Sequence, residues 1–415
     1  MSTVTVSQSV QKRITATLFL SQSLFGAAMI ASFTLMAIVA AHLSGSDSAA
    51  GVPPMLTMLG RSAAAYPVGW LMDRAGRRPG LSLGYMLAML GAMLSVASII
   101  SGSFMGFCVG SVLFGMGRGA SEQARFVAAE VYLPHRQAKV IGLIVFAGAV
   151  GAIGGPLLVD PSGRLAAAYG LHAHTGPYLA ATVFAALSAA LTFTLLRPDP
   201  MAVGRRLVVQ AREADSPARS LRVIFAGGTV RLAVTAMVIG QLVMTLIMVI
   251  TPLHMDHHSH SLKAISWVIM SHTLGMYGLS SLTGWLTDRA GRVPIIAMGS
   301  IMLAVSSLLT PASADMASLA FALFLLGLGW NFCFIAGSSL LSSALSSSER
   351  GRAQGANEMM IALAAGTGSL GTGFVFAWGN IVAVSIVGLV FSLALIGVTV
   401  WFVQVRLGVR SEKCP

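Results

Sequence analysis

Apolar segments long enough to cross a lipid bilayer recur along the whole 415-residue chain. A membrane-spanning helix needs roughly 20 apolar residues, and segments of that kind fall at 14–41, 52–71, 80–101, 104–129, 138–159, 176–196, 226–252, 263–286, 294–311, 315–345, 354–378 and 380–404. With 55% hydrophobic and 10% charged residues, the composition excludes a water-soluble domain of this size. The sequence therefore predicts an all-α membrane protein with twelve transmembrane helices. The first segment is too long for a cleaved signal peptide, so we expect it to remain in the membrane.

The basic residues are distributed unevenly between the loops. The chain carries a formal charge of +12, which in a soluble protein would suggest nucleic acid. Here, however, the arginines and lysines fall in alternate loops and tails, and the opposite face offers only Arg164 and Lys263. By the positive-inside rule both termini lie in the cytoplasm. We therefore expect a multi-pass membrane protein that binds no nucleic acid. The family resemblance described below implies the bacterial inner membrane.

An eleven-residue motif occurs twice in the chain. Gly69-Trp-Leu-Met-Asp-Arg-Ala-Gly-Arg-Arg-Pro79 returns as Gly284-Trp-Leu-Thr-Asp-Arg-Ala-Gly-Arg-Val-Pro294, with nine positions identical. Each copy follows the second span of a six-span half. The pattern resembles the loop motif of the major facilitator superfamily, which implies two pseudo-symmetric six-helix halves. We place them at 1–196 and 226–415, joined by a basic cytoplasmic linker at 197–225.

The charged residues of the repeated loop are candidate gating residues. They are Asp73, Arg74 and Arg77 in the first copy and Asp288, Arg289 and Arg292 in the second. An arginine can bond both to an acid at a helix end and to lipid phosphate, so a cluster shared between halves would be a latch that forms and breaks. The alternative is that the arginines only set the topology. The superfamily resemblance implies a loop that stabilises one of two alternating-access states.

Methionine and histidine recur at four-residue spacing on the seventh and eighth spans. The pairs are Met244 with Met248 and His272 with Met276, and residues i and i+4 share a helix face. Thioether sulfur favours Cu(I), and imidazole also suits copper. Counting about 1.5 Å per residue from the membrane edges puts both pairs roughly 18–26 Å deep, near the midplane where such transporters bind substrate. The sequence predicts a copper site there, and ordinary packing is the alternative because methionine is also common core filler.

The N-terminal half does not repeat these ligands. The motif offset sets Thr57 and Arg61 opposite His272 and Met276. Arg61 could join Arg118 and Glu122 of the fourth span in a buried ion-pair network or coupling element. Since Arg118 and Glu122 are four residues apart, an internal salt bridge is the simpler interpretation.

The pairing of Met-xxx-Met with His-xxx-Met in a major facilitator frame is similar to the CcoA-like copper importers. That resemblance implies binding of copper by Met244, Met248, His272 and Met276, and a supply of copper for maturation of cbb3-type cytochrome oxidase. It also implies downstream partners, either a copper chaperone or oxidase assembly factors. Cysteine chemistry accompanies some members of the group, but Cys108, Cys333 and Cys414 form no CxxC pair, and we expect them to pack in the bundle.

A histidine-rich stretch follows the seventh span. His254, His257, His258 and His260 lie within seven residues, on the loop that the charge rule places outside the cytoplasm. They could collect copper at the entrance, or they could simply belong to a solvated loop. His42 occupies the corresponding position of the first half, and we interpret His172 and His174 as solvated.

These features predict a copper transporter that works by alternating access, inward in direction and monomeric, with copper as substrate and no cofactor. The chain has no nucleotide-binding or catalytic signature, so we do not expect an enzyme. Two alternatives remain open: a proton-coupled drug or metabolite exporter of the same fold, which would use Glu122 and Arg118, and a membrane assembly factor that presents copper without transporting it.

Overall fold

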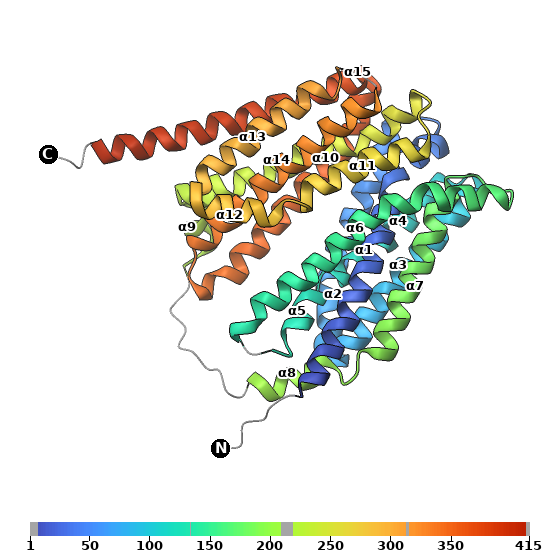
Figure 1. Ribbon diagram of the computed structural model, residues 1–415, viewed down its shortest axis with the longest axis horizontal. Coiled ribbons are helices and arrows are strands. Elements are labelled where there is room, and N and C mark those ends of the chain that lie inside the picture. Colours follow the sequence, from blue (N-terminus) through green and yellow to red (C-terminus); the bar gives the residue numbers. More distant parts are fainter. Residues whose placement is uncertain (1–6, 133, 209–218, 313–314, 412–415) are drawn as a thin grey trace. The chain divides into compact units, whose positions relative to one another are not determined.

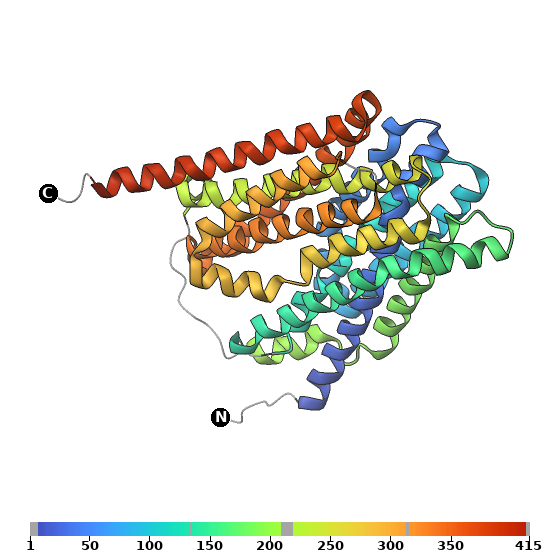
Figure 2. The same ribbon diagram turned by 45° about the horizontal axis from the view of Figure 1, so that its top comes forward.

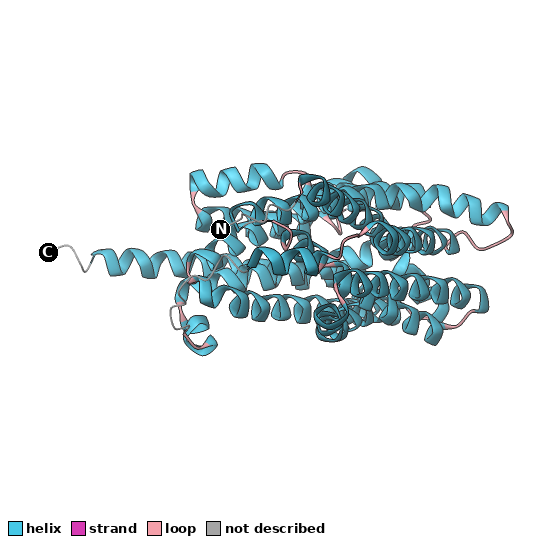
Figure 3. Cartoon of the chain, turned by 90° about the horizontal axis from the view of Figure 1, so that it is seen from below, coloured by secondary structure: helices cyan, strands magenta, loops and turns pink. Residues whose placement is uncertain are grey.

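The computed structural model describes residues 7–132, 134–208, 219–312 and 315–411, and the secondary structure within these ranges is helical throughout (Figures 1 and 3). The backbone forms two compact units, Met1–Ala214 and Asp215–Pro415. Each unit carries one copy of the repeated loop.

The first unit contains six membrane-crossing segments. Its elements are α1 (Gln8–Ser44), the short 3₁₀ helix η1 (Asp47–Gly51), α2 (Val52–Ala75), α3 (Arg77–Ser101), α4 (Phe104–Ser121), α5 (Ala124–Ala129), α6 (Pro134–Ala168), α7 (Thr175–Leu195) and α8 (Pro200–Val208). Helix α1 packs against α6 and α7, and α4 packs against α2 and α3.

The second unit repeats that arrangement. Its elements are α9 (Leu221–Ala226), α10 (Gly228–His257), α11 (Leu262–Tyr277), α12 (Ser280–Ala290), α13 (Arg292–Leu309), α14 (Met316–Ser343) and α15 (Ser347–Ser411). Helix α14 packs against α10, α11 and α13, and α15 packs against α10 and α13, as Figure 2 shows. Helix α15 contains the last two crossings, because Gly379 and Asn380 depart from helical geometry in its middle.

Eight helices in the described ranges are long and apolar enough to cross a membrane when judged one by one: α1, α3, α6, α7, α10, α13, α14 and α15. The other crossings are α2, α4, the α11–α12 pair and the second part of α15. Helices α2 and α4 carry Arg61 and Arg118, respectively. The predicted architecture of twelve spans in two halves is confirmed.

Glycines at equivalent positions let the helices of each unit approach closely. A Cβ atom on Gly115 of α4 would lie 2.0 Å from the carbonyl oxygen of Thr57 on α2, and one on Gly327 of α14 would lie 2.3 Å from that of His272 on α11. Since real Cβ atoms essentially never come within 3.0 Å of another heavy atom, each contact requires glycine. The repeat therefore extends from the loop motif to the helix crossings.

Candidate functional site

His272 is the most informative of the predicted ligands. Its side chain is 1% exposed, and its Nδ1 lies 3.0 Å from the carbonyl oxygen of Leu323 on α14. Because a carbonyl can only accept, Nδ1 carries the proton and Nε2 carries the lone pair. Nε2 is buried and has no hydrogen-bond partner among the described residues. A buried ring nitrogen with a free lone pair can bind a metal ion or accept a hydrogen bond from a substrate.

The thioether residues lie on α10 and α11. Met244 and Met248 are 8% and 7% exposed, and Met276 is half-buried. Helices α10 and α11 make few close contacts with each other, and both pack against α14. The four predicted ligands thus lie on two helices that a third helix positions.

The eighth span is interrupted just after the helix that carries His272 and Met276. We expected a continuous segment at 263–286, but α11 ends at Tyr277 and α12 begins at Ser280. At the break, side chains contact the carbonyl oxygen of Met276. Asn331 Nδ2 donates a hydrogen bond to it over 2.6 Å, and Ser280 Oγ lies 3.5 Å away. Broken helices with side-chain partners of this kind line the substrate sites of many transporters.

An aromatic cluster that sequence reasoning missed lies beside the same helices. Trp330 of α14 stacks on Phe334 with ring centroids 4.8 Å apart and meets Tyr277 edge-on at 6.2 Å. The indole N–H donates to Gln241 Oε1 over 2.9 Å, and Gln241 Nε2 donates to Thr245 over 3.1 Å. By the offset that relates Gly115 to Gly327, Trp330 occupies the position that Arg118 has in the first unit.

The histidine-rich stretch is partly helical, because α10 continues through Pro252 to His257. His254 is buried and His258 exposed. The His258 Nδ1 lies 2.9 Å from the His254 carbonyl oxygen, and the two rings are 4.5 Å apart. No three His, Cys, Asp or Glu side chains within the described ranges converge as a metal site. The entrance role of this stretch, including His260, stays a prediction.

The loop before α7 differs from the expectation of solvated histidines. His174 is 8% exposed, and its ring centroid lies 5.3 Å from that of His42 and 4.5 Å from that of His172. Burial, together with the neighbouring imidazoles of His172 and His42, lowers the pKa of His174 to about 4. His174 is therefore neutral at pH 7, and only His172 is exposed as expected.

The first unit holds an ionic cluster. Arg61 Nε lies 2.8 Å from Glu122 Oε2, and Arg118 Nε lies 3.4 Å from Glu122 Oε1. The internal salt bridge and the wider network therefore coexist, and the contact between α2 and the end of α4 is the shorter one. The side chains of Arg61, Arg118 and Glu122 are 22%, 22% and 31% exposed, respectively.

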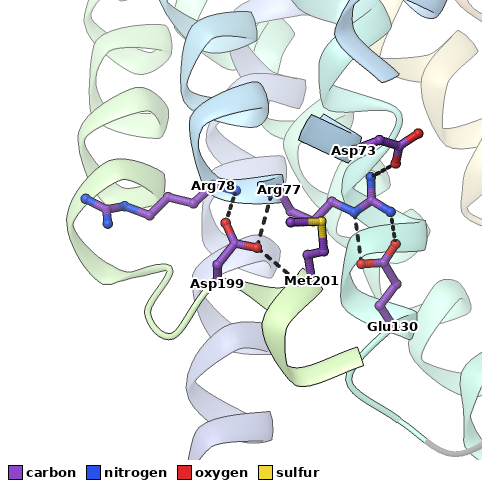
Figure 4. Close-up of polar contacts among 6 residues, drawn as sticks. All are labelled: Asp73, Arg77, Arg78, Glu130, Asp199 and Met201. Carbon is purple, nitrogen blue, oxygen red and sulfur yellow. Dashed lines mark hydrogen bonds and ion pairs between the residues drawn. The ribbon is translucent and has the colours of Figure 1, made fainter. Parts of the chain in front are cut away.

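The first loop copy is ion-paired within its own unit (Figure 4). Arg77 donates to Asp73 over 2.7 Å and forms a two-bond pair with Glu130 at 2.6 and 3.0 Å. The carboxylate of Asp199 accepts the backbone N–H groups of Arg77 and Arg78 at 3.1 and 3.0 Å. It also accepts the N–H of Met201 at 2.9 Å. The start of the linker thus caps the N-terminus of α3.

The second loop copy keeps the backbone of the first, but its arginine Arg292 contacts a different partner. Gly76 and Gly291 both adopt positive φ, at 108° and 90°. An arginine stacks on the preceding tryptophan in each copy, with Arg74 at 4.3 Å from Trp70 and Arg289 at 5.4 Å from Trp285. Arg292, however, donates to Ser339 over 3.0 Å, and Asp288 is exposed. A latch between the units stays a prediction.

The two described cysteines are buried. Cys108 and Cys333 are free thiols, and Cys333 lies against Gly240 and Gly299. Both positions agree with packing. Cys414 lies outside the described residues.

The family model of the Major Facilitator Superfamily matches residues 18–258 and 233–413. The chain belongs to this superfamily. Among curated relatives, the Bacillus subtilis (strain 168) protein YdeG, an uncharacterized MFS-type transporter, is 34% identical over 95% of this chain and 93% of its own length. The riboflavin transporter RfnT of Brucella anthropi is 29% identical over 79% of this chain and 80% of its own length.

Solved transporters share the fold at low sequence identity. A D-xylose–proton symporter superposes with a TM-score of 0.70 at 19% identity, covering 92% of this chain and 97% of that one. A bacterial homologue of the lysosomal transporter Spinster gives 0.70 at 14% identity, with 96% of both chains covered. The superfamily and the fold are those of multi-pass membrane transporters.

Proposed function

We propose that this transporter carries copper, taken up by alternating access through a site made of Met244, Met248, His272 and Met276. The observation that carries the proposal is the buried Nε2 of His272, whose lone pair lacks a partner in the described part of the chain. Leaving such a nitrogen unused costs free energy in a helix bundle. A bound ion would remove that cost.

The donor set suits a soft monovalent ion. Three thioethers and one neutral imidazole favour Cu(I) over hard cations such as Mg²⁺. The bond from Nδ1 to the Leu323 carbonyl orients the ring, as the second ring nitrogen of metal-binding histidines commonly does. Neutral ligands leave the charge on the ion, so a cavity open to one side at a time is needed for it to cross.

The resemblance to the CcoA-like copper importers implies the further features of this proposal. The protein would belong to the CcoA-like copper importers of the bacterial inner membrane, with both termini cytoplasmic. The imported copper would supply maturation of cbb3-type oxidase through a chaperone or assembly factor. The Arg61–Glu122–Arg118 cluster, which lies in the unit without soft ligands, would couple transport to a second ion.

A second candidate substrate is a planar aromatic solute such as riboflavin. The aromatic cluster of Trp330, Phe334 and Tyr277 favours it, because flat rings bind against aromatic side chains. His272 Nε2 would then accept a substrate N–H. The relative RfnT is named for riboflavin transport.

A binding experiment separates the two candidates. Purified full-length protein would be titrated with Cu(I) against a competing chelator, and separately with riboflavin by fluorescence quenching. Met248→Leu should weaken copper binding at least about tenfold, the loss that even outer-shell changes cause. The matched control is Met302→Leu, on α13, which should leave affinity unchanged. Riboflavin binding without copper binding would favour the second candidate.

A further inference from the structure

All four methionines of α10 lie on one face of that helix. They are Met237, Met244, Met248 and Met255, and at 100° per residue their directions fall within about 20° of a single line. Met237 lies two turns before Met244, roughly 10 Å closer to the start of α10. The row of methionine sulfurs on α10 therefore extends beyond Met244 and Met248, the two methionines of the proposed copper site.

Met237 has an unusually polar setting for a buried methionine. It is 1% exposed, and its sulfur accepts hydrogen bonds from Ser338 Oγ on α14 at 3.3 Å and from Asn357 Nδ2 on α15 at 3.6 Å. Three helices of the second unit thus bring a thioether, a hydroxyl and an amide together. A methionine that only filled space would lie among apolar side chains.

The amide of Asn357 supplies an independent sign of a ligand. Asn357 is 4% exposed, and its Oδ1 is buried with no hydrogen-bond partner in the described ranges. Burying a carbonyl oxygen without a donor is unfavourable. Such an oxygen can coordinate a cation, and a rotation of the amide would bring it to the sulfur that Nδ2 now contacts.

We infer that Met237, Asn357 and Ser338 form a second, weaker copper site. It lies between the start of α10 and the central ligands, by which we mean the four residues of the proposed copper site (Met244, Met248, His272 and Met276). This inference rests on the proposed copper transport. An arriving ion would replace the two hydrogen bonds to the Met237 sulfur and would take the Oδ1 of Asn357 as a ligand.

The chemistry of the two sites gives them an order. One thioether with two neutral oxygens holds Cu(I) more weakly than three thioethers and an imidazole. Transport requires that an ion bind well enough to enter and weakly enough to leave. A weaker site two helical turns from the central ligands meets the second requirement, and by the charge rule the start of α10 is the cytoplasmic end.

The test uses purified full-length protein in detergent and Cu(I) titrated against chelators of graded affinity. The wild type should bind two copper ions, one tightly and one at least tenfold more weakly. His272→Ala with Met276→Ala should lose the tight ion and keep the weak one. Adding Met237→Leu to that variant should abolish the remaining ion, whereas adding Met302→Leu should not. Asn357→Asp should tighten the weak site, since it replaces the amide oxygen with a carboxylate.

The outcomes separate the two claims. If the wild type binds no Cu(I), the proposed function is wrong and the second site with it. If the wild type binds one ion and the His272→Ala, Met276→Ala variant binds none, the central site stands and the second site is refuted. The second site is also refuted if the variant that combines His272→Ala, Met276→Ala and Met237→Leu still binds the weak ion and shows unchanged thermal unfolding.

Discussion

Replacing Gly327 by alanine should damage the copper site without touching a ligand. The new Cβ atom would lie 2.3 Å from the His272 carbonyl oxygen and 2.9 Å from the Met276 nitrogen, whereas ordinary contacts begin at 3.4 Å. Both partners are backbone atoms, so no side chain can move aside. Helices α11 and α14 must therefore separate by roughly 1 Å at this crossing, since overlap of this size is strongly repulsive.

The size of the effect follows from that displacement. Overpacking of a tight core typically costs about 1–3 kcal/mol, so the protein should remain folded with a lower unfolding temperature. Metal–ligand distances tolerate only about 0.2 Å, so a shift of His272 and Met276 by several times that amount should break the coordination. We expect Cu(I) affinity to fall about 10- to 100-fold, the range seen when outer-shell support is lost.

Two matched variants control the experiment. Gly115→Ala creates the same clash in the first unit, against Thr57, and should lower stability similarly without changing copper affinity. Gly371→Ala has open space around the new Cβ atom and should change neither. Chelator competition and thermal unfolding are measured on all three proteins. Wild-type affinity in folded Gly327→Ala, or equal losses in Gly115→Ala, would refute the reasoning.

Three further outcomes are expected. Glu122→Gln should lower the unfolding free energy by about 1–2 kcal/mol, less than a fully buried pair would cost because its side chains are partly exposed; unchanged chemical denaturation would contradict this. Asp199→Ala, which uncaps α3, should slow copper uptake into vesicles and leave Cu(I) affinity unchanged, and a loss of affinity would argue against it. His174 has a depressed pKa of about 4, so its contribution to stability is complete above pH 6.5 and is lost as the pH falls toward 4; the protection factor of the Thr175 amide, which is its hydrogen-exchange rate relative to the intrinsic rate at each pH, should fall over that range in the wild type and not in His174→Phe.

The architecture was predictable from the sequence because membrane helices are specified locally. Apolar length defines each span without reference to its neighbours, and the repeated loop relates the two halves directly. Local spacing also placed Met244 with Met248 and His272 with Met276 on shared helix faces. Each of these inferences uses residues that lie within one helix or one motif.

The parts that sequence reasoning missed depend on contacts between distant residues. Arg77 pairs with Glu130 and its backbone N–H with Asp199, across 53 and 122 positions, and no local pattern indicates such partners. The break between α11 and α12 is tolerated because Asn331, from another helix, satisfies the freed carbonyl of Met276. The unsatisfied oxygen of Asn357 is likewise visible only once the helices are assembled.

The divergence of the halves is also a property of the assembled helices. Positions that hold Arg61 and Arg118 in the first unit hold Met276 and Trp330 in the second. One unit therefore presents an ionic cluster, and the other presents soft and aromatic groups at the equivalent positions of the repeat. The motif offset predicted the exchange of Arg61 for Met276, but the aromatic stack around Trp330 needed the structure.

Copper uptake is the most direct test of the central claim. Cells that lack the protein would receive either the wild type or His272→Ala with Met276→Ala, at equal membrane abundance, and accumulation of radioactive copper would be followed together with that of riboflavin. The account predicts that the wild type restores copper accumulation, that the double variant does not, and that riboflavin accumulation is unaffected by either. Copper uptake by the double variant equal to that of the wild type would contradict it.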